Sequence, residues 1–176
     1  RFQAPWVDFG TALHCAFGTM AALMHRKATG RGQWVEGALL GTALTIANSA
    51  LIEQAVIKAD RKPSRSRSQT SGPGDILRCK DGHILVACVG NPLFKRVAQM
   101  IGRPDLLEDK RFKTDIDRGN NGKDLTDIME QWTRERTCEE ALAALAAAEV
   151  PAAPVLKPQA PLDDPHIKSI GVFQPV

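Results

Sequence analysis

Asp8 has the clearest capacity for chemistry in this sequence, because it lies between apolar neighbours just before a long apolar run. A carboxylate near the start of a helix stays ionised beside the positive end of the helix dipole, where it can act as a nucleophile or a base. Gly10 follows closely and leaves the backbone open to the approach of a ligand. The same position also suits a helix cap, because a carboxylate there accepts backbone N–H bonds. The pattern leaves both interpretations open.

Other reactive arrangements are absent from the sequence. It contains no GxSxG motif, no P-loop and no complete GxGxxG motif. Its four histidines are scattered, and none is paired with a serine or cysteine in the manner of a catalytic triad. The cysteines lie far apart without CxxC spacing, so we expect reduced thiols and no metal site.

The segment that positions Asp8, residues 1–58, is predicted to hold two long helices and a short strand. The first helix spans 11–27, where apolar side chains recur at the three-and-four spacing of one buried face. A turn at 30–32 leads into a strand at Gln33–Glu36. The second helix is predicted from residue 37 or 38 to residue 58.

A change of pattern after residue 58 predicts a second unit. Residues 59–74 are rich in Arg, Ser, Pro and Gly without any period, which is typical of a linker. Two β-prone runs follow, Ile76–Lys80 and His83–Val89, joined by Asp81-Gly82, a strong signal for a two-residue hairpin turn.

Helices are predicted after the hairpin, so that residues 75–150 form a small α+β domain. A first helix begins at Asn91-Pro92, because proline suits the first turn of a helix. Residues 151–176 are Pro-rich and extended, and we expect them to return toward the first segment. Three further helices and a strand are expected at Asp105–Glu108, Gly122–Glu135, Cys138–Ala148 and Ala153–Leu156.

Composition indicates a globular protein. Of 176 residues, 43% are hydrophobic and 24% charged, and no uninterrupted run of about 18 apolar residues offers a membrane span. The start has no signal-peptide layout, so we expect a cytoplasmic location. Net charge is only +3, but Lys58–Ser68 carries five basic residues against one acidic residue. This run suits a solvated linker or, less well without aromatic neighbours, a nucleic-acid contact; we expect no nucleic-acid partner.

The stretch "VDFGTALHCAFGTMAALMHRKATGRGQWVEGALL" resembles the family III CoA-transferases, also called the CaiB/BaiF family. In that family an aspartate precedes a helix that runs into AALxxRxxTGxGQ, which is matched here from Ala21 to Gln33. The later runs "DILRCKDGHILVACVGN", "IGRPDLLEDKRF" and "VPAAPV" are similar to the family's small domain and the return to its large domain. The resemblance implies an α/β fold, with an α+β small domain inserted in a Rossmann-like large domain.

The resemblance implies that Asp8 is the catalytic residue. Its carboxylate attacks the thioester of an acyl-CoA and gives a mixed anhydride, which CoA converts to an aspartyl-CoA thioester before a carboxylic acid takes up the CoA. Coenzyme A is then a substrate, and no bound cofactor or metal is implied. Backbone N–H groups near Gly10 and the helix start are expected to stabilise the oxyanion. Residues expected to contact substrate or CoA are Gly10, Ser68, Gly72, Gly74 and Asn91.

Two alternatives stay open beside the transferase. A racemase of the 2-methylacyl-CoA type uses the same aspartate as an acid-base group. The racemases resemble one another in an EPxF motif at the place where this chain has Asn91-Pro92-Leu93-Phe94. The chain thus has an amide where a racemase has a carboxylate, and an amide does not titrate near neutral pH. Family members are about twice as long and form interlinked dimers, so the chain is also consistent with a non-catalytic, self-associating fragment. In either case we expect a homodimer.

Overall fold

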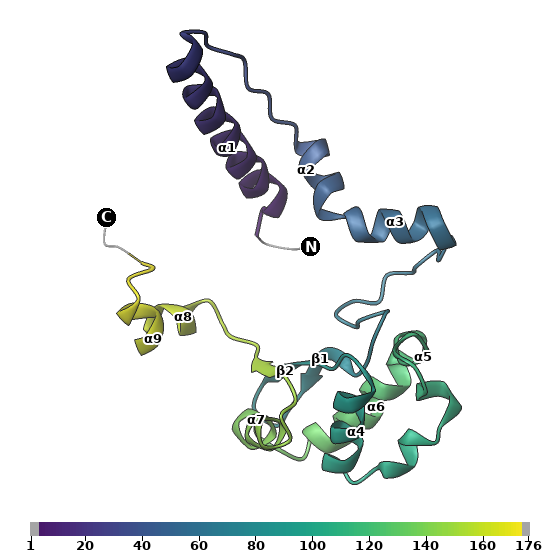
Figure 1. The fold of residues 1–176 in the computed structure, drawn as a ribbon. Coiled ribbons are helices and arrows are strands. Elements are labelled where there is room, and N and C mark those ends of the chain that lie inside the picture. The colour runs from purple at the N-terminus through teal and green to yellow at the C-terminus, as the bar shows by residue number, and fades with distance from the viewer. Residues whose placement is uncertain (1–3, 174–176) are drawn as a thin grey trace. The chain divides into compact units, whose positions relative to one another are not determined.

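The computed structural model describes residues 4–173, and the ends of the predicted segments at 1–3 and 174–176 lie outside the described residues. The chain forms two compact units, an N-terminal unit, Arg1–Arg61, and a C-terminal unit, Lys62–Val176 (Figure 1). The finer division at residues 58, 74 and 150 stays a prediction.

In the N-terminal unit, residues 4–61 contain three helices. Helix α1 spans Trp6–Thr29 and therefore begins five residues before the predicted start. Pro5 precedes it, and proline is compatible with a helix start because no N–H is needed there. The helix ends at Gly30, whose φ of 73° is left-handed and whose N–H donates to the Arg26 carbonyl.

The second predicted helix of this unit is broken. Helices α2, Leu39–Ile46, and α3, Asn48–Ile57, meet at Ala47 with a bend of 65°. Asn48 and Ser49 follow the break, and both residue types compete with helical backbone bonding, which favours helix ends. The predicted strand at Gln33–Glu36 is wrong, because no strand among the described residues pairs with this segment.

The C-terminal unit contains a three-stranded antiparallel sheet. Strands β1, Gly74–Arg78, β2, His83–Ala87, and β3, Ala152–Pro154, lie in the order β1-β2-β3. Side chains alternate between buried and exposed along β1 and β2, as expected for a sheet with one covered face. The hairpin is confirmed, but Arg78 pairs with His83, so four residues rather than two form its loop.

Helices cover the buried face of this sheet. Figure 1 shows α4, Asn91–Met100, α6, Gly122–Thr133, and α7, Cys138–Ala147, gathered beside the strands. Their buried side chains join Leu77, Ile84 and Val86 of the strands in one hydrophobic core. The remaining elements are short: the 3-10 turns η1, Pro104–Leu107, and η2, Lys110–Phe112, and the helices α5, Asp115–Asn120, α8, Gln159–Asp163, and α9, Pro165–Ser169.

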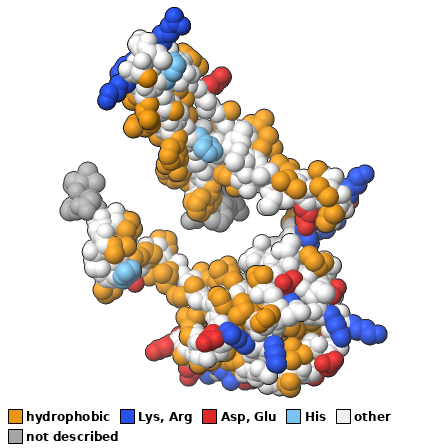
Figure 2. Space-filling view, viewed as in Figure 1, with side chains coloured by type: hydrophobic (Ala, Val, Ile, Leu, Met, Phe, Trp, Pro, Cys, Tyr) orange, Lys and Arg blue, Asp and Glu red, His pale blue; other side chains and the backbone are white. Residues whose placement is uncertain are grey.

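Burial differs sharply between the units. The core lies in the C-terminal unit, whereas Thr42 is the one buried residue among the described residues of the N-terminal unit. Figure 2 shows hydrophobic side chains spread over α1 and α2. Trp34 is 90% exposed, and α1 also exposes Phe9, Leu13, Phe17, Met20 and Met24. The two sets of elements confirm the predicted α/β class, mostly helical with a short hairpin.

Helix α1 is long and apolar enough to cross a membrane, and α2 with α3 passes the same test as one bent span. A search for uninterrupted apolar runs missed this, because polar residues such as His14 and Thr19 interrupt α1. A helix that packs in an apolar core has the same length and composition, so no membrane is assigned by this finding. The expected absence of a membrane partner stays a prediction.

Candidate active site

Asp8 lies in the first turn of α1, with its side chain exposed. The capping interpretation is wrong, because the helix begins at Trp6 and its start has no side-chain cap. Among residues 4–173, no hydrogen bond or ion pair engages the Asp8 carboxylate. The carboxylate oxygens are therefore free for a reaction.

The start of α1 also supplies unused backbone donors. In the part of the chain that the structure describes, no acceptor takes the N–H groups of Val7 and Asp8. Gly10 lies further inside the helix, where its N–H is used by the helical hydrogen-bond ladder. The helix start, rather than Gly10, therefore offers the donors that an oxyanion needs.

Gly10 has a packing role. A Cβ at this position would lie 2.9 Å from Thr42 Cγ2, so glycine allows α1 and α2 to approach closely. Gly18 does the same for Val35, whose Cγ1 would lie 2.7 Å from an added Cβ. The sequence had suggested an opening for a ligand at Gly10, and the neighbouring helix fills that space.

The other predicted binding residues, Ser68, Gly72, Gly74 and Asn91, belong to the C-terminal unit. Ser68 closes a turn by donating its N–H to the Gly74 carbonyl at 2.7 Å, and its hydroxyl lies 2.9 Å from that of Ser71. Gly72 is buried, and an added Cβ would meet Leu125 and Arg118. Ser68 and Gly72 thus lie in a packed loop that ends at Gly74, the first residue of β1, whereas Asn91 begins α4.

Asp75 anchors the same loop to the sheet. Its side chain is nearly buried, and its carboxylate accepts hydrogen bonds from the Ser66 hydroxyl at 2.5 Å, the Ile76 N–H at 2.8 Å and the Thr126 hydroxyl at 2.7 Å. These donors replace water around the charge. The C-terminal end of segment 59–74, which was predicted to be a linker, is therefore held in place by hydrogen bonds.

Arg118 is the residue that sequence patterns missed. It is 0% exposed, and its guanidinium forms an ion pair with Asp115 at 2.7 Å and stacks over the Phe94 ring. It also donates to Asn91 Oδ1 at 2.9 Å and to the Phe112 carbonyl at 2.7 Å. The i,i+3 spacing of Asp115 and Arg118 was the available signal, but on a helix it usually marks a surface pair.

The Asp115 carboxyl is held ionised by its neighbours. Burial opposes ionisation, but hydrogen bonds from Arg118 and from the Gly90 N–H outweigh it and lower the pKa of Asp115. Asn91 belongs to the same cluster, because its amide oxygen accepts a hydrogen bond from Arg118. Its role there is structural.

Gly119 should not tolerate alanine. An added Cβ would collide with the Gln69 carbonyl and lie 2.8 Å from the Thr70 nitrogen, and a backbone cannot rotate away as a side chain can. We expect Gly119→Ala to lower the free energy of unfolding of the C-terminal unit by about 2 kcal/mol. Gly122→Ala is the matched control, since its nearest obstacle is the Ser68 carbonyl at an ordinary 3.5 Å. Equal urea midpoints by circular dichroism for the two variants would contradict this assignment.

The thiols of the C-terminal unit are poor rivals to Asp8 as nucleophile. Burial raises the pKa of the Cys88 thiol to about 12 and also raises that of Cys79. The reactive thiolate is therefore scarce at neutral pH. All four cysteines are free, and the described residues contain no group of three or more side chains that could hold a metal ion.

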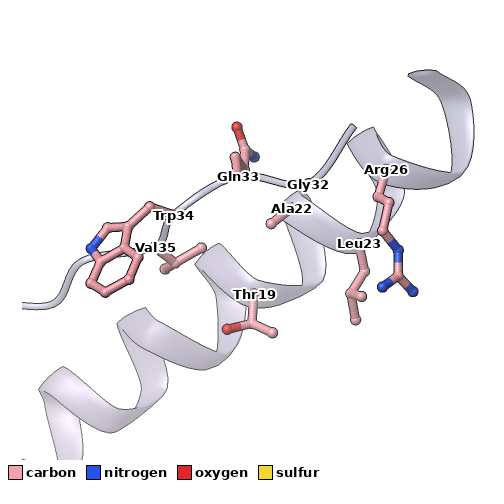
Figure 3. A pocket seen from close by; sticks show the side chains of 8 residues that line it. All are labelled: Thr19, Ala22, Leu23, Arg26, Gly32, Gln33, Trp34 and Val35. Atoms are coloured by element: carbon pink, nitrogen blue, oxygen red, sulfur yellow. The ribbon is translucent and has the colours of Figure 1, made fainter. Parts of the chain in front are cut away.

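A cleft of about 340 Å³ lies between the second half of α1 and the segment that follows it. Thr19, the first lining residue, is about 16 Å from Asp8 along the helix axis. Figure 3 shows that the side chains of Gln33 and Arg26 point in opposite directions. The polar groups do not converge on one point, so this cleft lacks the arrangement typical of a ligand site.

The basic run Lys58–Ser68 is partly neutralised. Arg61 donates to both Glu53 oxygens at 2.7 Å. This ion pair leaves one positive charge fewer for phosphates. The expected absence of a nucleic-acid partner and the cytoplasmic location stay predictions.

Comparison with known proteins gives consistent matches over the whole chain. A sequence model described as CoA-transferase family III matches residues 1–176. Succinyl-CoA–D-citramalate CoA-transferase of Chloroflexus aurantiacus is 28% identical over 173 residues, which cover 96% of this chain and 43% of the relative. Formyl-CoA:oxalate CoA-transferase of Rhodopseudomonas palustris is 27% identical, over 93% of this chain and 44% of the relative.

Solved structures agree with these matches. A CaiB/BaiF family protein from Brucella suis has a TM-score of 0.75 at 26% identity, over 97% of this chain and 45% of its own. A hypothetical protein from Mycobacterium tuberculosis has a TM-score of 0.76 at 25% identity, with the same coverage of 97% and 45%. The chain thus spans less than half the length of the proteins it matches.

Proposed function

The chain belongs to CoA-transferase family III, and from this we propose that the protein transfers CoA between an acyl-CoA and a carboxylic acid, with Asp8 as the reactive group. The relatives compared above are named for succinyl-CoA and formyl-CoA, so short acyl groups are the substrate class we propose first. The chain carries the reactive aspartate, and a longer protein or a second chain completes the CoA site.

The proposed reaction proceeds by covalent capture. One Asp8 oxygen attacks the thioester carbonyl carbon, the C–S bond breaks, and CoA leaves as thiolate from a mixed anhydride. The thiolate then attacks the Asp8 carbonyl carbon of the anhydride, which releases the first acid as carboxylate and leaves an aspartyl-CoA thioester. An incoming carboxylate reverses these steps and leaves as the new acyl-CoA. Each step is easier than direct exchange between two anionic partners.

The observation that supports this proposal is that, among residues 4–173, the Asp8 carboxylate and the nearby N–H groups of Val7 and Asp8 have no hydrogen-bond partner. The carboxylate supplies the nucleophile, and a donor pair at a helix start can stabilise the oxyanion. Incubation with succinyl-CoA or formyl-CoA, rapid quenching and peptide mass spectrometry test it. We expect a hydroxylamine-sensitive adduct on Asp8, and an adduct found only on another residue would contradict the proposal.

The transferase is preferred to the racemase on the chemistry of position 91. Asn91 has no acid-base function near neutral pH, and its amide oxygen is occupied by Arg118. A racemase needs a second titratable group beside the aspartate. A non-catalytic module is consistent with the partial coverage of the relatives, but it leaves the aspartate that the family resemblance places at position 8 without a role.

We also propose that the protein is a homodimer. The N-terminal unit exposes apolar side chains along all of α1, and exposed apolar surface of this extent favours association. Size-exclusion chromatography with light scattering is expected to give twice the chain mass of 19.1 kDa. A monomer at tens of micromolar would contradict this proposal.

A further inference from the structure

The most buried side chain of the N-terminal unit is polar. Thr42 is 4% exposed, and its methyl group faces Gly10 across the α1–α2 contact. Its hydroxyl lies 2.8 Å from the Thr11 hydroxyl and 3.3 Å from His14 Nδ1. A buried hydroxyl needs partners, and here both come from α1.

The Thr11 hydroxyl links Thr42 to the start of α1. Thr11 Oγ1 lies 2.7 Å from the Val7 carbonyl and 2.8 Å from Thr42 Oγ1, and its single proton can be donated to either oxygen. Thr42 Oγ1 also lies 3.3 Å from His14 Nδ1, where the donor depends on the histidine tautomer. These contacts form a chain from α2 through Thr11 to the Val7 carbonyl.

This chain of bonds ends on the peptide group that carries Asp8. The Val7 carbonyl and the Asp8 N–H belong to the same planar peptide unit, so a bond that fixes one also fixes the other. Within α1 the Val7 carbonyl accepts the Thr11 N–H of the helical ladder, and the Thr11 hydroxyl adds a second contact to the same oxygen. Helix α2 contacts the Thr11 hydroxyl through Thr42.

We propose that Thr42 is a positioning residue for Asp8, acting through Thr11 on the Val7–Asp8 peptide. This rests on the proposed function of Asp8 as nucleophile. Removal of the Thr42 hydroxyl leaves the carboxylate present but loosely oriented, and loss of orientation lowers the rate of the attack more than the binding of substrate.

Thr42→Val tests this, because valine keeps the methyl packing against Gly10 and removes only the hydroxyl. With succinyl-CoA we expect the rate of Asp8 adduct formation to fall about tenfold at unchanged half-saturating concentration. Thr42→Ser, which keeps the hydroxyl, should restore the rate to within about twofold. Thr45→Val is the matched control, since within the described chain the Thr45 hydroxyl bonds only to the Gly41 carbonyl of the same helix. Equal rates for Thr42→Val and Thr45→Val would overturn the proposal.

A second readout is independent of acyl transfer. In the nitrogen-15 NMR spectrum of the full chain, Thr42→Val should shift the Val7, Asp8 and His14 signals from their wild-type positions. If wild type forms no Asp8 adduct but these shifts occur, the proposed function fails and the positioning contact stands. If Thr42→Val leaves the Val7 and Asp8 signals where Thr45→Val leaves them, the positioning role is wrong whatever the activity.

Discussion

Asp8→Asn is expected to abolish the hydroxylamine-sensitive adduct and to lower CoA transfer by at least about a thousandfold. An amide oxygen is a far weaker nucleophile than a carboxylate, and an amide cannot form the anhydride without losing its nitrogen. The substitution changes the shape of the side chain very little. Because no hydrogen bond or ion pair among residues 4–173 uses the Asp8 carboxylate, the fold should be unaffected. Adduct yield by mass spectrometry and transfer rate by separation of acyl-CoAs measure the effect.

Glu139→Gln is the matched control for this experiment. Glu139 is also an exposed acidic residue in the first turn of a helix, α7. It has the same electrostatic setting without the family match of position 8, so we expect full activity. A comparable loss in both variants, or an Asp8→Asn protein that still transfers CoA, would remove Asp8 from the reaction.

Arg118→Met is expected to lower the free energy of unfolding of the C-terminal unit by about 3 kcal/mol. Methionine fills much of the volume but removes the Arg118 donors of Asn91 Oδ1 and the Phe112 carbonyl and leaves the Asp115 carboxylate with only the Gly90 N–H. Removing one partner of a buried pair costs more than the pair itself contributes. Urea unfolding followed by circular dichroism measures the change. Arg134→Met is the control, since Arg134 forms an exposed pair with Glu130 and should cost below about 1 kcal/mol.

The contribution of Arg118 to the free energy of unfolding should also depend on pH. The folded-state pKa of Asp115 is lowered, so it lies below the unfolded value of about 3.9. Stability from this carboxylate is therefore complete above that value and is lost as the pH falls through the folded-state pKa. The difference between wild type and Arg118→Met should shrink over that acidic range, and a difference that stays constant there would contradict the assignment.

Local signals allowed much of the fold to be predicted. The glycine stop at Gly30, the proline at the start of α4 and the alternating burial of the hairpin all act within a few residues. The strand at Gln33–Glu36 failed because a strand needs a partner from elsewhere in the chain, and periodicity carries no information about that partner. The break at Ala47 was not predicted, because the apolar pattern continues through it.

The site was predicted less completely, for the same reason. Asp8 and its place near a helix start follow from neighbouring residues. The role of Gly10 depends on Thr42, and that of Asn91 depends on Arg118, which are distant in sequence. The family resemblance carried what local patterns did not contain, and the matches over residues 1–176 confirm that resemblance.

The uncovered α1 helix has a consequence for how sequence variation acts in this protein. A conventional core residue such as Leu77 is constrained by the domain that contains it. Apolar residues on the outside of α1, such as Phe17 and Met24, have little to lose when the isolated chain unfolds. Their replacement should leave melting temperatures almost unchanged and should weaken the affinity for the surface that covers the helix. Selection on these residues therefore acts through binding to a partner surface.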